Sequence, residues 1–371
     1  MKATINVNTL RNAIAKLQGI IDKRNTRPIL ANTLFKFKTN SLELLATDLE
    51  VSLKVISPVT SDFEYSFCLN TKSLFEILRE LPDDVLEIKI NKDNNIIELN
   101  CREIHFTLLI TNSEEYPQLV FPERNNSFDI STNIFSELIS RTSYSISNDE
   151  TRLFLNGLYF QTIEGRLRVV STDGHRLALI DSIDIDESIE ELVNGVIIPK
   201  KGIFELKKII ETTDHLNIKL SFDETFLYVH IDSNIHLSIR LISREFPKYQ
   251  TVIPNDTKYK LVLDTKEFLN AVKRIKIMSS DKSNAVKLIL DNDNVTIEAN
   301  HPTLGKASET INGNFNGDKM EIGFNAKYLL DALLTFDTNE VNLELINEMK
   351  PIIINSDEIS NYLSIIMPLK I

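Results

Sequence analysis

Several features that would narrow the function are scarce in this sequence. Only two of its 371 residues are cysteine, Cys68 and Cys101, and neither belongs to a CxxC pair or has a pair of histidines nearby. A disulfide framework and a structural zinc site are therefore not expected, and both thiols are predicted to be small buried apolar groups. We expect the protein to use neither a metal nor a cofactor.

The sequence also lacks an apolar run long enough to span a bilayer. Its first twenty residues interleave asparagine, arginine and lysine with apolar positions, which excludes the continuous apolar segment of a signal peptide. With 42% hydrophobic and 25% charged residues, the composition is that of a globular protein with two or three domains. We expect it in the cytoplasm, with no membrane partner.

An internal repeat is present instead. Apolar residues at the helical spacing i, i+3, i+4 follow a short extended segment near the start of each third of the chain, over residues 8–14, 133–139 and 266–272. The polar side chains predicted to cap these helices are Asn8, Ser131 and Asp264. A second helix is predicted at a matching place in each third, over residues 74–78, 203–207 and 328–332.

Alternating, β-branched runs between the helices predict antiparallel strands. Each third is also expected to close on a strand marked by proline, over residues 116–122, 246–254 and 367–368. Four similarities in the same order favour an α+β protein made of three tandem repeats of one domain, each with two helices packed on antiparallel sheets. The predicted domains are residues 1–125, 126–255 and 256–371.

Residues 169–177 of the middle repeat resemble a catalytic site at first sight. Asp173 could orient His175 as a general base, which would make the protein a hydrolase. However, no serine or cysteine nearby has the signature of an activated nucleophile, and the equivalent Asp48 of the first repeat has no histidine beside it. An acid that caps a turn and an imidazole in a pocket wall are the favoured interpretation, and the hydrolase stays as the alternative.

Positive charge is also scarce, because the net charge of the chain is −12. A uniform surface of this charge would repel nucleic acid. The charge is not uniform, however: it is positive over the predicted helices at 8–27, 200–211 and 265–282, and zero over the other three. Basic helices on an acidic protein can present one face to a polyanion, and the lack of interleaved aromatic residues favours contact with phosphates over contact with bases.

These features together resemble one family. Three α+β repeats and basic helices combine with Thr172-Asp173-Gly174-His175-Arg176-Leu177, Phe246-Pro247-Lys248-Tyr249 and the final Ile366-Met367-Pro368-Leu369-Lys370-Ile371. The whole chain is similar to the bacterial DNA polymerase III β subunits, the sliding clamps. The resemblance implies a head-to-tail homodimer, in which the chain is half of a six-domain ring that encircles duplex DNA without sequence specificity.

The resemblance also implies a processivity factor and not an enzyme. Its partners would be double-stranded DNA, the catalytic subunit of DNA polymerase III, the clamp loader, and other polymerases and repair factors. A GxxxxGK[ST] motif is absent from the sequence, so ATP-driven loading would come from another protein.

Three groups of site residues follow from the same resemblance. A pocket for short hydrophobic partner peptides would be formed by Leu155, Thr172, Gly174, His175, Arg176, Leu177, Pro247, Val252, Ile365, Met367, Pro368 and Leu369. The residues facing DNA would be Arg24, Lys72, Arg79, Lys200 and Lys201. The dimer contact would pair Phe106 and Leu108 with Ile277 and Met278 of the other subunit.

The chain departs from the family pattern at three positions. Asp149 stands where relatives often carry a glutamine near DNA, Ser364 where they often carry an aromatic residue, and Lys370 where arginine is usual. Because arginine and lysine are not interchangeable at a directed contact, the preferred partner peptide is expected to differ in detail.

Overall fold

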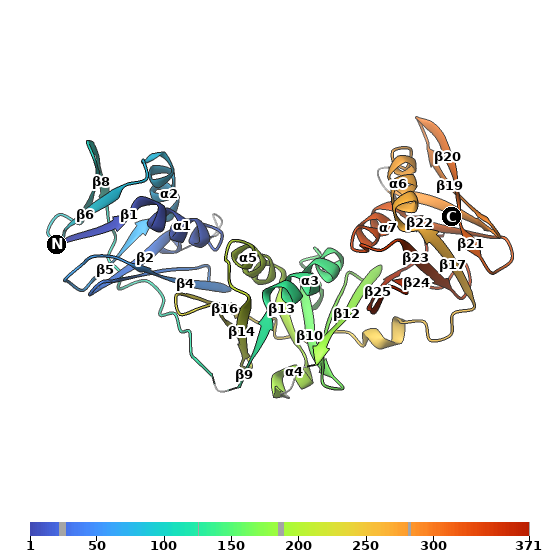
Figure 1. Cartoon of the computed structure of the whole chain (residues 1–371), viewed down its shortest axis with the longest axis horizontal. Helices are drawn as coiled ribbons and strands as arrows, with labels where there is room; N and C mark the ends of the chain where they lie inside the picture. The colour runs from blue at the N-terminus through green and yellow to red at the C-terminus, as the bar shows by residue number, and fades with distance from the viewer. Residues whose placement is uncertain (22–26, 125, 185–188, 281–282, 371) are drawn as a thin grey trace. The chain divides into compact units, whose positions relative to one another are not determined.

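The computed structural model of the chain describes residues 1–21, 27–124, 126–184, 189–280 and 283–370. Its contacts divide it into two compact units: Met1–Asn133 with Lys201–Leu241, and Ile134–Lys200 with Ile242–Ile371. We refer to these as unit 1 and unit 2. Each of the four sheets formed by the described residues lies within one unit, and its strands are antiparallel (Figure 1).

Unit 1 contains a four-stranded and an eight-stranded sheet. The strand order of the smaller sheet is β1 (Lys2–Asn6), β6 (Val85–Asn91), β7 (Ile96–Cys101), β8 (Ile104–Leu109). That of the larger sheet is β5 (Tyr65–Asn70), β2 (Asn32–Lys38), β3 (Ser41–Thr47), β4 (Val51–Pro58), β16 (Ile235–Arg240), β15 (Phe226–His230), β14 (Asn217–Phe222), β9 (Ser127–Ser131).

Unit 2 contains a nine-stranded and a four-stranded sheet. The order of the larger sheet is β13 (Val196–Pro199), β10 (Gly157–Ile163), β11 (Arg166–Thr172), β12 (Arg176–Asp184), β25 (Ile359–Ile366), β24 (Ile352–Ser356), β23 (Glu340–Leu345), β17 (Tyr259–Asp264), β21 (Asn314–Phe315). That of the smaller sheet is β20 (Gly305–Asn312), β19 (Asn294–His301), β18 (Ala285–Asp291), β22 (Met320–Asn325).

All six predicted helices are present, in pairs that recur along the chain. They are α1 (Val7–Gln18), α2 (Thr71–Glu80), α3 (Thr132–Thr142), α5 (Lys200–Glu211), α6 (Thr265–Lys276) and α7 (Ala326–Leu333). Within unit 1, α1 packs on α2, and within unit 2, α6 packs on α7 (Figure 1). The predicted helical spacing is confirmed, because α1 buries Leu10, Ala13 and Ile14, which lie on one face. A short helix, α4 (Glu190–Asn194), was not predicted.

Two details of the sequence prediction are wrong. The side chain that caps α1 is Asn6, which accepts a hydrogen bond from the Thr9 amide, so the helix begins before the predicted Asn8. Asp264 caps α6 as predicted, by accepting from the Glu267 amide. The first proline-marked strand is absent from residues 116–122, and a 3₁₀ helix, Tyr249–Val252, replaces the second. The third is absent as well, because β25 ends at Ile366. Proline has no amide hydrogen to give to a strand partner, which explains the loss.

The core of the described residues is mainly apolar, and both cysteines are free and buried, as predicted. The described residues contain no group of three or more histidine, cysteine or acidic side chains that could hold a metal ion. Their helices are all too short or too polar to cross a membrane.

Candidate functional site

The stretch that suggested catalysis forms the tight turn between β11 and β12. The Asp173 carboxylate accepts hydrogen bonds from the amides of His175 at 2.9 Å and Arg176 at 3.1 Å. The Thr172 hydroxyl donates to the Arg176 carbonyl at 2.7 Å and accepts from the Gly174 amide. An acid that accepts from two backbone amides in this way stabilises a turn, and its recorded hydrogen bonds go to these amides and to Arg176 rather than to an imidazole.

The first repeat builds the same turn between β3 and β4. Asp48 accepts from the amides of Glu50 at 2.9 Å and Val51 at 2.7 Å, and Thr47 accepts from the Leu49 amide. Leu49 has φ of 79°, in the left-handed region, and Gly174 at the equivalent place has φ of 89°. Because the first repeat builds the same turn without a histidine, we infer that Asp173 stabilises the turn and does not serve to orient His175.

Arg176 connects this turn to the third repeat inside unit 2. Its guanidinium pairs with Asp173 at 3.0 Å and with Asp331 at 2.6 Å, and it donates to the Tyr144 carbonyl at 2.7 Å. It also lies over the ring of Tyr328, 4.5 Å from the centroid. Burial opposes the charge, but the hydrogen bond to Asp331 and the attraction of Asp173 outweigh it and raise the pKa of Arg176. The side chain is only 8% exposed, so it is a fixed part of the pocket wall.

A cavity of about 300 Å³ opens beside this turn, and it brings together most of the predicted pocket residues. The predicted residues that line it are Leu155, Thr172, Gly174, His175, Arg176, Leu177, Pro247, Val252, Ile365 and Met367. Leu177 and Ile365 are almost fully buried, whereas Val252 and Met367 are 46% and 41% exposed. A buried apolar wall beside exposed apolar side chains is typical of a site that binds an apolar segment of another molecule.

The ring of His175 forms part of this wall. It lies nearly parallel to the ring of Tyr328, with centroids 6.3 Å apart. Its carbonyl accepts a hydrogen bond from the Met367 amide at 2.9 Å, which fixes the end of β25 against the turn. His175 therefore contributes a surface and a backbone acceptor to the pocket.

Three lining residues were missed and two predicted ones lie elsewhere. Lys248, Tyr249 and Thr251 line the cavity because residues 249–252 coil into a 3₁₀ helix, whereas the predicted strand would have turned alternate residues away. The Phe246-Pro247-Lys248-Tyr249 motif was the available signal. Pro368 and Leu369 are outside the lining, and the Leu369 amide donates instead to the Gly323 carbonyl of β22.

The basic side chains predicted to face DNA differ in their surroundings. Lys72 and Arg79 of α2 are each 64% exposed and have acidic neighbours, Glu76 at 3.7 Å and Glu80 at 3.1 Å. Exposed pairs of this kind are weak, so both cations are available to an incoming phosphate. Arg24 lies outside the described residues.

The two lysines that begin α5 have protein partners. Lys200 donates to the Asn148 side chain at 2.6 Å. Lys201 pairs with Asp48 of the first-repeat turn and donates to the Ile20 carbonyl at 3.0 Å. Its ammonium therefore links repeats inside unit 1, a role that the sequence did not predict.

The predicted interface residues occupy two different units. Phe106 and Leu108 are half-buried on β8, the edge strand of the smaller sheet of unit 1. Ile277 and Met278 directly follow α6 in unit 2, and Ile277 is 74% exposed. An open sheet edge and a large exposed apolar side chain each favour contact with another chain.

Three α+β repeats joined through shared sheets, with an apolar pocket beside a turn stabilised by Asp173, are the architecture of a clamp protein. Three family models match the chain in order: the DNA polymerase III beta subunit N-terminal domain over residues 1–120, the central domain over 129–248 and the C-terminal domain over 250–370. The chain belongs to the DNA polymerase III beta subunit family, the β sliding clamps.

Individual relatives agree with this assignment. The beta sliding clamp of Haemophilus influenzae is 31% identical over 373 residues, and the match covers 100% of both chains. The solved Caulobacter crescentus pol III beta is 29% identical and superposes with a TM-score of 0.94 over 100% of both chains. The Bartonella birtlesii sliding clamp bound to griselimycin is 27% identical, with a TM-score of 0.95 over 100% of both chains.

The family is one of processivity factors associated with DNA and its polymerase, and its members are not catalytic subunits. The hydrolase alternative is therefore not supported. The turn geometry of Asp173 supplies the physical reason, since its carboxylate is committed to backbone amides and to Arg176.

Proposed function

We propose that the chain forms a head-to-tail homodimeric ring that encircles duplex DNA without sequence specificity and tethers the replicative polymerase to it. We place it in the cytoplasm, and we place the limits of its three domains near Asn125 and Asn255. The observation that carries the ring is the strand order, because every repeat contributes two four-stranded halves, and among the described residues two of these halves, those ending in β8 and β20, lack the junction that the others make.

The junctions between repeats follow one rule. In the first kind of half, the order of neighbouring strands in the sheet is β5-β2-β3-β4, β13-β10-β11-β12 and β22-β18-β19-β20. In the second kind it is β1-β6-β7-β8, β9-β14-β15-β16 and β17-β23-β24-β25. The middle repeat joins its neighbours by pairing β16 with β4 and β12 with β25. In each junction, the strand written last in a half of the first kind pairs with the strand written last in a half of the second kind.

One last strand of each kind has no such partner among the described residues. β8 pairs only with β7, and β20 pairs only with β19 in its sheet. A third junction of the same type would join β20 of one copy to β8 of another. Two such junctions would close two chains into a ring, since each copy offers one edge of each kind. Exposed edges of this kind are normally covered.

Retention on DNA tests the ring directly. The loaded protein should stay on closed circular DNA and leave linear DNA through its ends, because a ring is held by topology and not by affinity. Gel filtration of the complexes at moderate salt measures the difference. Equal retention on both forms would contradict encirclement.

Exposed basic side chains on the helices support phosphate contact in the proposed ring. We expect the double variant Lys72→Ala/Arg79→Ala to reduce the slope of log K against log salt by about 1.8, which is two contacts at roughly 0.9 each. Titration of duplex DNA at several salt concentrations measures the slope.

The control for the salt experiment is Lys2→Ala/Lys89→Ala. It removes the same charge from exposed positions on the sheet, where the two side chains pair with Glu87. The control should leave the slope unchanged. An equal loss of slope in both double variants would show that net charge, and not a DNA-facing set of helices, governs binding.

The apolar pocket of unit 2 is the proposed docking site for short hydrophobic peptides of polymerases, the clamp loader and repair factors. Its cavity of about 300 Å³ suits a few apolar side chains. The Bartonella birtlesii and Pseudomonas aeruginosa clamps have been solved with griselimycin bound, so clamps of this family do take a ligand. Lys248 at the rim adds a cation that an acidic residue of the peptide could meet.

Val252→Asp is expected to weaken binding of a short leucine- and phenylalanine-containing peptide by about 10- to 100-fold. The new carboxylate would lose its water when the apolar peptide covers it, at a cost of roughly 1–3 kcal/mol. Because Val252 is 46% exposed in the free chain, folding should be little affected. Fluorescence anisotropy of the labelled peptide measures the affinity.

Met349→Asp is the matched control, since Met349 is 61% exposed and lies outside the pocket lining of the same unit. It should bind the peptide like the unaltered protein. If both variants bound normally, the peptide would have to dock elsewhere.

A further inference from the structure

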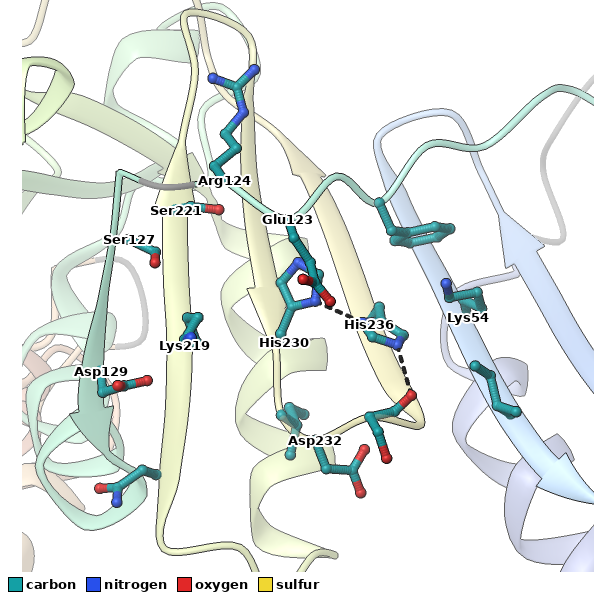
Figure 2. Close-up of a pocket in the computed structure, with 15 residues that line it drawn as sticks. Lys54, Glu123, Arg124, Ser127, Asp129, Lys219, Ser221, His230, Asp232 and His236 are labelled. Carbon is teal, nitrogen blue, oxygen red and sulfur yellow. Dashed lines mark hydrogen bonds between the residues drawn. The ribbon is translucent and has the colours of Figure 1, made fainter.

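A polar cavity of about 830 Å³ lies on unit 1, away from the features discussed above. Its walls come from β4, β9, β14, the β15–β16 hairpin and residues 121–124 of the linker that joins the first repeat to the middle one (Figure 2). Two histidines, His230 and His236, face each other at its centre across the hairpin (Figure 2).

The linker covers an apolar cluster of the first repeat. Tyr116 belongs to this cluster together with Cys68, and Leu119 and Phe121 pack against it. The Tyr116 hydroxyl donates to the Leu45 carbonyl at 3.3 Å. Cys68 is fully buried beneath this cover, so access to its thiol reports whether the linker is in place.

The end of the linker is held by the two histidines. The Nε2 of His230 lies 3.2 Å from the Pro122 carbonyl, and the Nε2 of His236 lies 3.1 Å from the Ser233 carbonyl. The two Nδ1 atoms are 2.7 Å apart. The ring of His236 also lies beside Phe121, with centroids 6.4 Å apart.

Counting hydrogens fixes the protonation of this pair. A carbonyl only accepts, so each Nε2 must carry a hydrogen, and a neutral imidazole has no second one to place on Nδ1. If both rings were neutral, the lone pairs of the two Nδ1 atoms would face each other at 2.7 Å. If both rings were charged, two N–H groups would face each other at the same place. Only one extra proton, shared between the Nδ1 atoms, satisfies all three contacts.

We propose that His230 and His236 share a single proton and that this proton holds the linker, residues 116–124, on the eight-stranded sheet. When the proton leaves, one ring must move its remaining hydrogen from Nε2 to Nδ1 to keep the contact between the rings. That ring then loses its carbonyl partner, which for His230 is Pro122 of the linker. The linker is held on the sheet while the pair carries its proton, and it is released when the pH rises and the proton is lost.

Charged groups on every neighbouring element limit the pair to one proton. Burial lowers the pKa of both imidazoles, and the ammonium of Lys54 on β4 lowers the pKa of His236 further. Lys219 on β14 lowers the pKa of His230. In the opposite direction, Glu123 of the linker raises the pKa of His230, and Asp232 of the hairpin turn raises that of His236. Arg124 and Asp129 also line the cavity, with opposite charges. The second proton is therefore excluded, and because both pKa values are lowered, the pair loses its one proton below the ordinary pKa of an imidazole.

The reactivity of the Cys68 thiol tests this attachment of the linker in the full-length protein. The rate of its modification by N-ethylmaleimide would be measured by peptide mass spectrometry relative to Cys101, which is buried in the other sheet of unit 1 and corrects for thiol ionisation. The ratio is expected to rise about tenfold between about pH 5 and about pH 7.5, with a midpoint below the ordinary pKa of an imidazole, the effect of losing one hydrogen bond. A ratio that is independent of pH would overturn the proposal, whether or not the variants below fold.

Two variants separate the pair from other histidines. His236→Phe keeps a ring beside Phe121 but has no proton to share, so His230 can keep its hydrogen on Nε2 for the Pro122 carbonyl at every pH, and the ratio should be low and independent of pH. His215→Gln removes the neighbouring imidazole that pairs with Asp232 at 2.8 Å, and it should keep the pH step. A pH step that persists in His236→Phe, or disappears in His215→Gln, would contradict a shared proton. The experiment requires neither DNA nor dimers, so its result is independent of the proposed ring.

Discussion

Arg176→Met is expected to lower the free energy of unfolding of unit 2 by about 3–5 kcal/mol, because removing one member of a buried ion pair leaves the others uncompensated. Arg176 is only 8% exposed, and its loss would strand Asp173 and Asp331 as well as the Tyr144 carbonyl. Methionine fills much of the same volume, so the change isolates the charge. Urea denaturation followed by circular dichroism measures the loss.

Arg152→Met is the control for this experiment. Arg152 also pairs with an aspartate three residues away, Asp149, but its side chain is 40% exposed. An exposed pair contributes less than about 1 kcal/mol. Similar losses in both variants would mean that burial does not decide the contribution of Arg176.

Ile277→Asp is expected to weaken the homodimer by on the order of 100-fold, or about 3 kcal/mol, and to abolish retention on circular DNA. Ile277 is 74% exposed, so the isolated chain tolerates a carboxylate there. In the proposed junction between β20 and β8 the same carboxylate would be buried without a partner. Sedimentation over a range of concentrations measures the dissociation constant.

Leu334→Asp provides a closely matched control. Leu334 directly follows α7, as Ile277 directly follows α6, and it is 62% exposed. It lies outside the proposed junction and should leave the dimer intact. A monomeric Leu334→Asp, or a fully dimeric Ile277→Asp, would rule out this interface.

Local patterns in the sequence were sufficient to predict the repeats and their helices. The apolar spacing of Leu10, Ala13 and Ile14 recurs in each third because every first helix buries one face. The Asp173 turn was predictable for the same reason, since an aspartate before a glycine satisfies its own backbone. Such features depend on residues that are close in the chain.

Contacts between distant residues could not be predicted from these patterns. The pairing of β4 with β16 joins segments from different repeats, and the link from Lys201 to Asp48 spans 153 residues. The 3₁₀ helix at Tyr249 was missed because its proline-marked sequence suits an edge strand equally well. The proximity of His230 to His236 depends on the register of a hairpin, which the turn at Asp232 fixes only once the fold is known.

The division of the middle repeat between two sheets has a consequence for folding. β9, β14, β15 and β16 complete the sheet of the first repeat, whereas β10 to β13 complete that of the third. A fragment cut near Asn125 and Asn255 would expose the edges of β16 and β12 together, and exposed edges invite aggregation. We therefore expect each half of the middle repeat to unfold together with the neighbour whose sheet it completes, and not with the other half.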